Sequence, residues 1–345
     1  MRNFLLGGAA VALLTAGAAA QVPGLTGTII VTNKTPSTAT IIDLGSGRIL
    51  ATLPTGAGPH EVALSADGGM AVVTDYSGQP GRTLTVIDLP ARQVVRTIDL
   101  GQYQRPHGIH FLAGDSLVAV TSEASGNVVV VNVIRGAIVK AVPTTQAGSH
   151  MVGIAADGRR AFTGNMRSHT VSQIDLAAGT FVRSWPVPNV PEAINVTPDG
   201  NEVWVGSNET GKISVLDPAT GTIRTAAEGF GWPYRVLFSP DGSQVFLPDL
   251  RNEQLRFLDR RTHAEAGRLE FPGGGPQGIT ITPDGRFLLE SMKWQARVVV
   301  IDAAEPDRGR QLPGQRDPGR PAPRGRSPVG PLRAARSAAT TRSAT

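Results

Sequence analysis

The hydrophobic pattern of the chain is one of short alternating strands that recur at a nearly constant spacing. Seven apolar segments each end in Asp or Asn, and their last residues lie 42 to 45 positions apart. These last residues are Asp43, Asp88, Asn132, Asp175, Asp217, Asp259 and Asp302. A Gly-containing turn dipeptide, usually Asp-Gly, precedes six of the segments and indicates a hairpin there. The chain therefore consists of seven similar units.

The unit at 192–226 shows its elements most clearly. Its alternation of apolar and polar residues predicts four strands, at 192–197, 202–207, 213–217 and 222–226. Pro- and Gly-containing turns separate them, which argues against helices. Units of this length with four short strands are typical of propeller blades. We predict an all-β fold over residues 21–304, a seven-bladed β-propeller with four-stranded antiparallel blades.

Three recurring sequences carry a resemblance to a known family. They are "IIVTN" at 29–33, the "VID" strand ends, and the "TPDG" turns at 197–200 and 282–285. With Ile30 in place of the usual Tyr, the chain resembles the YVTN-repeat, YncE-like propellers. The resemblance implies the seven-bladed fold. Related propellers include lactonases and haem d1 domains, so it implies no single chemistry.

The N-terminal residues 1–20 are typical of a secretory signal peptide. Arg2 precedes a mostly apolar run at 4–16, and Ala18 to Ala20 fit a cleavage site. We therefore expect a periplasmic or secreted protein with no stable membrane span after cleavage. The sequence contains no cysteine, which excludes a disulfide framework and a thiolate metal site.

The C-terminal residues 305–345 break the repeat. The first unit has strands only near 28–32, 39–43 and 48–53, so closing the ring requires strands from the other end of the chain. Residues 305–345 are rich in Arg and Pro and lack apolar alternation, so we expect disorder and incomplete closure by the termini. We interpret this tail as the product of a frameshift near residue 304. The alternative is a basic tail that binds anionic surfaces.

The tail also explains the basic character of the chain. The formal net charge is +5, but residues 305–345 hold nine Arg and three acidic residues, which leaves −1 for residues 1–304. A basic chain often binds nucleic acid, but the repeats carry no basic stripe. We therefore expect no nucleic-acid partner. We also expect a monomer.

One position near the start of the first strand in each unit carries a polar residue. Aligned by their turns, six units place His60, His107, His150, Glu192, Tyr234 and Gln277 there. In the resembled families this strand is the innermost of its blade, which implies that the six side chains meet at one mouth of a central channel. The neighbouring loops hold Tyr103, Arg105, Phe230, Trp232 and Arg235, which we expect to supply aromatic walls and two positive charges.

This set of residues suits two kinds of chemistry. Imidazoles and a carboxylate are ligands for a divalent metal, which predicts a metal site at His60, His107, His150 and Glu192. Without a metal, the same group suits an anionic or lactone ligand, with a histidine as general acid or base. A polar residue at a strand start can also simply cap the strand.

Three functions follow as hypotheses. The first is a binding or scaffold module for a small ligand or metal. The second is a lactonase or lyase-type enzyme that uses the His and Glu residues. The third is a cofactor-bearing redox propeller, for which no axial ligands can be matched.

Other polar and aromatic residues have structural interpretations. His110 is out of phase with His107, so we expect it to pack on the other face. We expect His169 and His263 to be solvated in turns, and Glu123 to serve turn chemistry. The strand-end Asp residues should accept turn N–H bonds. Trp185, Trp204 and Trp294 should pack between blades.

Overall fold

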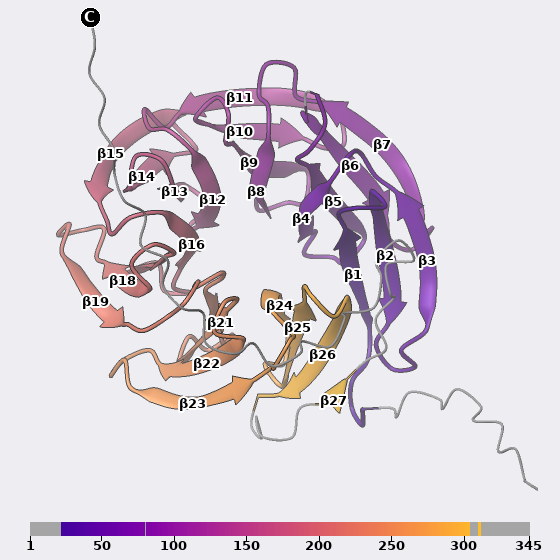
Figure 1. Ribbon diagram of the computed structural model, residues 1–345. Helices are drawn as coiled ribbons and strands as arrows, with labels where there is room; N and C mark the ends of the chain where they lie inside the picture. Colours follow the sequence, from indigo (N-terminus) through magenta and orange to yellow (C-terminus); the bar gives the residue numbers. More distant parts are fainter. Residues whose placement is uncertain (1–21, 80, 304–309, 312–345) are drawn as a thin grey trace, which may run out of the picture.

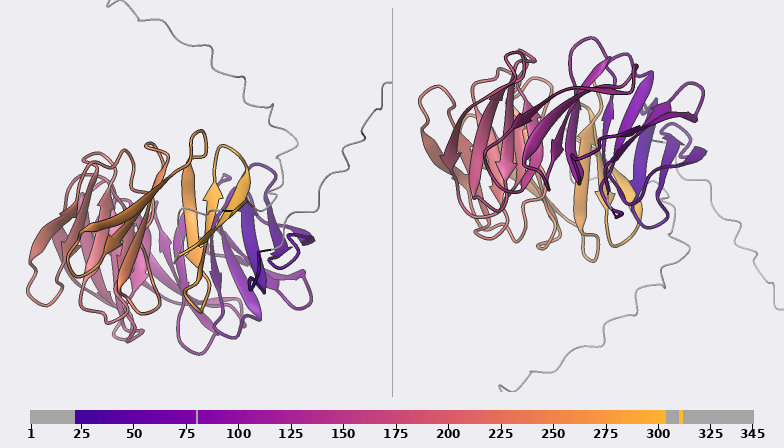
Figure 2. Two further views of the ribbon diagram at one scale, coloured as in Figure 1. Left: turned by 90° about the horizontal axis from the view of Figure 1, so that it is seen from below. Right: turned by 90° about the horizontal axis from the view of Figure 1, so that it is seen from above.

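The described residues form a ring of seven antiparallel sheets (Figure 1). The computed structural model describes residues 22–79, 81–303 and 310–311. Figure 2 shows the ring from two sides as a thick disc whose strands run from one face toward the other. The predicted seven-bladed propeller is confirmed.

The first four blades follow the chain in order. Blade one has β1 (Thr28–Asn33), β2 (Thr38–Asp43) and β3 (Ile49–Pro54). Blade two has β4 (Pro59–Leu64), β5 (Met70–Asp75), β6 (Thr83–Asp88) and β7 (Gln93–Asp99). Blade three has β8 (Pro106–Phe111), β9 (Leu117–Ser122), β10 (Asn127–Asn132) and β11 (Ala137–Pro143). Blade four has β12 (Ser149–Ile154), β13 (Arg160–Asn165), β14 (Thr170–Asp175) and β15 (Thr180–Pro186).

The remaining three blades complete the ring. Blade five has β16 (Pro191–Val196), β17 (Val203–Ser207), β18 (Lys212–Leu216) and β19 (Ile223–Ala227). Blade six has β20 (Leu237–Phe238), β21 (Gln244–Asp249), β22 (Gln254–Asp259) and β23 (Glu265–Glu270). Blade seven has β24 (Pro276–Ile281), β25 (Phe287–Met292), β26 (Arg297–Asp302) and β27 (Arg310–Gln311).

The core lies between neighbouring blades, because the middle strands of each sheet are buried on both faces. Val72 and Val86 of blade two, for example, pack with Val118 and Val120 of blade three. Burial of such side chains contributes roughly 1.5–3 kcal/mol each. The outermost strands face solvent, as the exposed Val95 of β7 shows. Each blade thus depends on its neighbours for much of its buried surface.

The predicted roles of the tryptophans and strand-end carboxylates are mostly confirmed. Trp204 of blade five meets Phe238 of blade six edge to face, with ring centroids 5.9 Å apart, and Trp185 is also buried between blades. Trp294 is 37% exposed, so the prediction for it is wrong. Carboxylate oxygens accept turn N–H bonds at Asp43, Asp88, Asp175, Asp217 and Asp259, as predicted.

Blades one and seven meet through side chains. Leu25 and Leu44 from the blade-one side form one apolar cluster with Phe287, Leu289 and Val298 of blade seven. The sheet of blade one contains only three strands among the described residues, and β1 pairs only with β2 there. Among the described residues, blades one and seven thus meet through packing and share no sheet. The predicted incomplete closure by the termini stays a prediction, because most of residues 304–345 lie outside the described part.

The prediction that residues 305–345 are disordered is wrong at two positions. Arg310 and Gln311 form a short fourth strand of blade seven, in register with Val300 and Val299. Backbone hydrogen bonds at a sheet edge need no apolar alternation, so the pattern gave no sign of this strand. The rest of 305–345, and the predicted signal peptide at 1–20, lie outside the described residues. Within the part of the chain that the structure describes, no helix is long and apolar enough to cross a membrane.

Candidate functional site

The six aligned positions lie at a repeated irregularity in the innermost strands. In blade two, Pro59 pairs with Asp75 and Val62 with Val73, so β4 has one residue more than β5 between these pairs. The same one-residue shift recurs near the start of β8, β12, β16 and β24. Blade six repeats it between the bridge Pro233–Asp249 and the pair Leu237–Phe246. Such bulges re-aim side chains, and here they direct them toward the ring axis.

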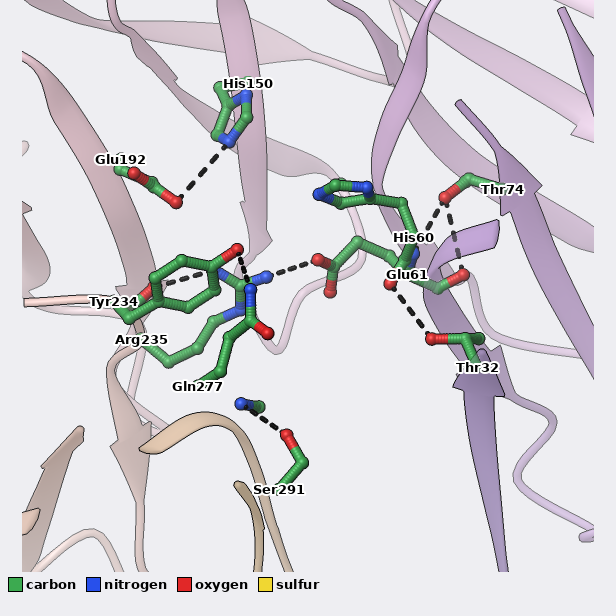
Figure 3. A network of polar contacts seen from close by, with 12 residues as sticks. Thr32, His60, Glu61, Thr74, His150, Glu192, Tyr234, Arg235, Gln277 and Ser291 are labelled. Carbon is green, nitrogen blue, oxygen red and sulfur yellow. Dashed lines mark hydrogen bonds and ion pairs between the residues drawn. The ribbon is translucent and has the colours of Figure 1, made fainter. Parts of the chain in front are cut away.

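Hydroxyl side chains of the second strands stabilise this irregularity. Thr74 of β5 accepts a hydrogen bond from the Glu61 N–H at 3.0 Å. In the same way, Ser291 of β25 accepts from the Gly278 N–H at 2.8 Å (Figure 3). A backbone N–H that leaves the ladder needs another partner, and these hydroxyls supply it. The sequence thus builds the bulge into both strands.

The three predicted histidines lie side by side. The ring centroids of His60 and His107 are 4.3 Å apart, and those of His107 and His150 are 3.6 Å apart. His107 is fully buried, and neither of its ring nitrogens has a hydrogen-bond partner among the described residues. Each unpaired buried polar group costs about 1–3 kcal/mol. This arrangement is costly unless something else binds there.

His150 lies between two carboxylates. Its Nδ1 donates to Glu123 Oε2 at 2.9 Å, and its Nε2 lies 3.9 Å from Glu192 Oε1. Glu123 also accepts from the Tyr76 hydroxyl at 2.9 Å. Burial favours the neutral carboxyl, but the hydrogen bond from His150 and nearby positive charge lower the pKa of Glu123. Glu123 therefore orients the imidazole and is more than a turn residue.

The other three aligned residues, Glu192, Tyr234 and Gln277, also form hydrogen bonds. Glu192 accepts hydrogen bonds from Asn208 and, at 2.9 Å, from Trp232 Nε1. Gln277 donates to the Tyr234 hydroxyl at 2.6 Å. Burial raises the pKa of Tyr234 to about 12, which keeps the phenol neutral. We call His60, His107, His150, Glu192, Tyr234 and Gln277 the inner arc.

An ion pair joins opposite sides of the ring. Arg235, in the loop before β20, donates to Glu61, which follows His60 in β4 (Figure 3). These side chains are only 13% and 19% exposed, so the pair is largely shielded from solvent. The Arg235 guanidinium also lies 4.4 Å from the centroid of the Tyr234 ring. The predicted positive charge of Arg235 is therefore at the site, but a carboxylate already partners it.

The electrostatic field at the histidines is positive. Burial, followed by the charges of Lys34 and Arg235, lowers the pKa of His60 to about 2. Lys34 Nζ lies 3.1 Å from His60 Nε2, to which it donates. Burial also lowers the pKa of His107, with His150 and His60 adding to the effect. Both imidazoles are therefore neutral near pH 7, which is the form that can bind a metal or accept a hydrogen bond.

An open groove of about 440 Å³ adjoins the inner arc. It is lined by Tyr76, Gln104 and Arg105, together with residues 77–79 and 81. Tyr76 connects the groove to the histidines, because its ring lies 4.8 Å from that of His60 and 5.2 Å from that of His107. Arg105 lies over the Tyr76 ring at 4.2 Å and 3.5 Å from Glu123. Tyr76 thus lines the groove and contacts the histidines, which do not line the groove themselves.

The potential metal ligands that lie close together in the structure differ from the predicted set. Among the described residues, one group of His and acidic side chains has ligand atoms within 4.8 Å of one another, namely His60, Glu61 and His107. His150 and Glu192 are not part of it. His150 Nδ1 is hydrogen-bonded to Glu123, and Glu192 Oε2 accepts from Asn208 and Trp232. The predicted four-residue ligand set thus shares only two residues with the compact group.

The family of the chain follows from its sequence. A family model described as YNCE-like beta-propeller matches residues 9–116 and again residues 112–229, together more than half of the chain. The chain belongs to the YNCE-like β-propeller family. The resemblance to YncE-like propellers is thereby confirmed. A search of the curated proteins found no significant match.

Solved structures support the propeller fold. The chain is similar to Kuenenia stuttgartiensis hydrazine synthase, with a TM-score of 0.73, 19% identity, and coverage of 80% of this chain and 92% of that one. It is also similar to a functionally unknown protein from Desulfotomaculum acetoxidans, with a TM-score of 0.60 and 15% identity. That match covers 70% of this chain and 81% of the other. At these identities the likeness shows the fold alone.

Four residues of this YNCE-like propeller have surroundings that differ from those predicted from the sequence. Phe230 is buried in the core under Arg256, and Tyr103 packs against the core of blades two and three, so neither lines the arc. His169 accepts a hydrogen bond from the Val190 N–H, and His263 packs edge-on against Trp204. The expectation that these two histidines are solvated is therefore wrong.

Sequence reasoning missed four polar residues at the site: Lys34, Glu61, Tyr76 and Asn208. Strand alternation assigns Glu61 to the face opposite His60, and only the bulge brings both to the axis. A signal was available, since Gly108 and Gly278 occupy the position after the arc residue in two other units. Glycine inside a strand pattern often marks a bulge.

Proposed function

We propose that this YNCE-like propeller is a binding module that holds a small anionic ligand at its inner arc. One observation carries the proposal: the same bulge in six blades directs a polar side chain of each toward one end of the ring axis. The groove supports it, because Tyr76 lines the groove and also contacts the rings of His60 and His107. Polar groups converging beside a pocket are the usual mark of a ligand site.

The charges favour an anion over a neutral molecule. Lys34, Arg235 and Lys293 all act as positive charges on His60. Arg105 adds a fourth positive charge at the edge of the groove, where its side chain is 49% exposed. The neutral imidazoles can donate hydrogen bonds to a carboxylate or phosphate oxygen. Such groups positioned together bind anions with charge-assisted hydrogen bonds.

Thermal unfolding with a set of anions tests this function. Acetate, succinate, citrate and inorganic phosphate are added separately, with sodium chloride at matched ionic strength as the control. An anion at about 100 times its Kd stabilises the folded protein by about 2.7 kcal/mol, which raises the Tm by several degrees. The shift should disappear in Arg105→Gln and persist in His169→Gln. Identical Tm values in all anions and in sodium chloride would sink the proposal.

A second candidate function is lactone hydrolysis. His150 favours it, because Glu123 fixes its Nδ1–H and leaves Nε2 toward the axis, as in a carboxylate-oriented general base. A pH-stat assay with unsubstituted five- and six-membered lactones tests the idea. His150→Gln should abolish the activity, and Glu123→Gln should reduce it. If the unaltered protein hydrolyses no lactone, the enzymatic function is contradicted and the binding function remains.

Export and a monomeric state are further proposals. Export rests on the sequence of residues 1–20, outside the described residues. N-terminal sequencing of the protein recovered from a periplasmic fraction should begin at Gln21. Retention of Met1 in a cytoplasmic fraction would contradict it. Sedimentation equilibrium should give the mass of one chain.

A further inference from the structure

The buried imidazole of His107 is the feature from which this inference starts. The side chain is 0% exposed, and neither ring nitrogen has a hydrogen-bond partner among the residues that the structure describes. The rings of His60 and His150 flank it on either side. A buried histidine normally has at least one nitrogen bonded. In His107 both ring nitrogens lack a partner among the described residues.

Two further potential ligands lie next to His107. His60 and Glu61 each offer an atom, and the ligand atoms of all three residues lie within 4.8 Å of one another. Atoms that bind one ion at about 2.0–2.2 Å are at most roughly 4.4 Å apart, so closing around an ion requires side-chain movements of about an ångström. The bulge of β4 makes this grouping possible, since it brings two consecutive side chains to the axis.

We propose that His60, Glu61 and His107 bind one divalent first-row transition metal ion. Two imidazoles and one carboxylate suit Zn²⁺, Co²⁺ or Fe²⁺ better than Ca²⁺ or Mg²⁺, which prefer oxygen ligands. A three-ligand site leaves coordination positions open. The inference rests on the proposed function, because the anionic ligand would occupy those open positions.

The neighbouring charges fit a site that is completed by an anion. Lys34 donates to His60, and Arg235 donates to one oxygen of Glu61, so two of the three ligands already have a positive neighbour. Lys293 adds to the positive charge acting on His60. These groups oppose an isolated cation and favour a cation with a bound anion. We therefore expect citrate or phosphate to strengthen metal binding.

Calorimetric titration of the EDTA-treated, dialysed full chain with Zn²⁺ tests the site, and the visible spectrum with Co²⁺ reports the coordination. One ion should bind per chain. His60→Gln and Glu61→Gln should each weaken binding at least about tenfold. His107→Gln serves as a third variant if it folds. His110→Gln on the same strand and His169→Gln are matched controls that should bind like the unaltered protein, and Tm values verify that each variant is folded.

The outcomes separate this site from the proposed function. No saturable binding, or binding equal in the His60 and Glu61 variants, would overturn the metal site. Loss of binding only in His150→Gln and Glu192→Gln would also overturn it, because it would assign the ion to other ligands. If the anion-induced Tm shift persists in EDTA while Zn²⁺ does not bind, the proposed function stands alone. If Zn²⁺ binds and no anion shifts the Tm, the metal site stands and the proposed function fails.

Discussion

At the scale of single residues, Glu290 shows how this ring tolerates a buried carboxyl group beside the arc residue Gln277. The side chain lies in β25, is 0% exposed, and has no hydrogen-bond partner for either carboxyl oxygen among the described residues. Burial raises the pKa of Glu290 well above its ordinary value. The folded state therefore holds a proton that the unfolded state releases near pH 4 to 5.

Glu290→Gln should make the protein more stable at neutral pH. Because the folded-state pKa is raised, stability is highest below the unfolded-state pKa and falls as pH rises through the folded one. The variant should remove a slope of up to about 1.4 kcal/mol per pH unit. Urea unfolding as a function of pH measures this slope. The comparison is made above the pKa of Asp75, because burial raises that pKa to about 6 and the titration of Asp75 would add its own slope at lower pH.

The exposed Glu270 of β23 provides the control for this prediction. Glu270→Gln should leave the pH profile unchanged, since water solvates this exposed carboxyl in the folded and the unfolded protein alike. If Glu290→Gln and Glu270→Gln gave the same profile as the unaltered protein, the buried carboxyl would not be protonated in the fold.

At the scale of elements, the close approach of inner strands limits which residues the arc can contain. A Cβ added at Gly108 of β8 would lie 2.6 Å from the Val152 nitrogen and 2.8 Å from the Met151 Cα of β12. These are backbone atoms, so the contact cannot be relieved by a side-chain rotation. Glycine after His107 thus lets neighbouring blades pack closely beside the arc.

Gly108→Ala should therefore destabilise the protein by about 1–3 kcal/mol, the usual cost of overpacking. Gly267→Ala is the control, because its added Cβ meets nothing within 4 Å and its backbone needs no positive φ. Urea unfolding of the two variants should separate them clearly. Equal stabilities would mean that β8 and β12 can move apart at little cost.

The elements of the fold were largely predictable, but the geometry of the site was not. Strands 192–197 and 202–207 are observed as Pro191–Val196 and Val203–Ser207, because period-two alternation marks a half-buried strand directly. The six arc positions were found by aligning repeats. Glu61 was missed because alternation carries no sign of a bulge, and the contact between Glu61 and Arg235 joins residues 174 positions apart.

At the scale of the whole molecule, we expect the junction between blades one and seven to be the least stable part of the ring. Blade one has no described strand inside β1, and blade seven ends in the two-residue β27. In the described part of the chain, these blades share no sheet and meet in the apolar cluster that includes Leu25 and Leu289. In a ring where each blade is stabilised by its neighbours, such a junction should open first.

Hydrogen exchange should reveal this junction. Amides of β1 and β26 should exchange about tenfold or more faster than those of β10 and β14, which lie in complete four-stranded sheets. Mass spectrometry of peptic fragments measures both regions in one experiment. Uniform protection around the ring would show that packing alone closes it as firmly as a shared strand.

The central claim, that the inner arc binds a ligand, is tested most directly by imidazole NMR. The chain has six histidines, of which His60, His107 and His150 belong to the arc and His110, His169 and His263 do not. With selectively ¹⁵N-labelled histidine, the anion that raises the Tm is titrated in, with and without Zn²⁺. The account predicts that the three arc resonances move and the other three stay. Unchanged arc resonances, or shifts confined to the other three, would contradict it.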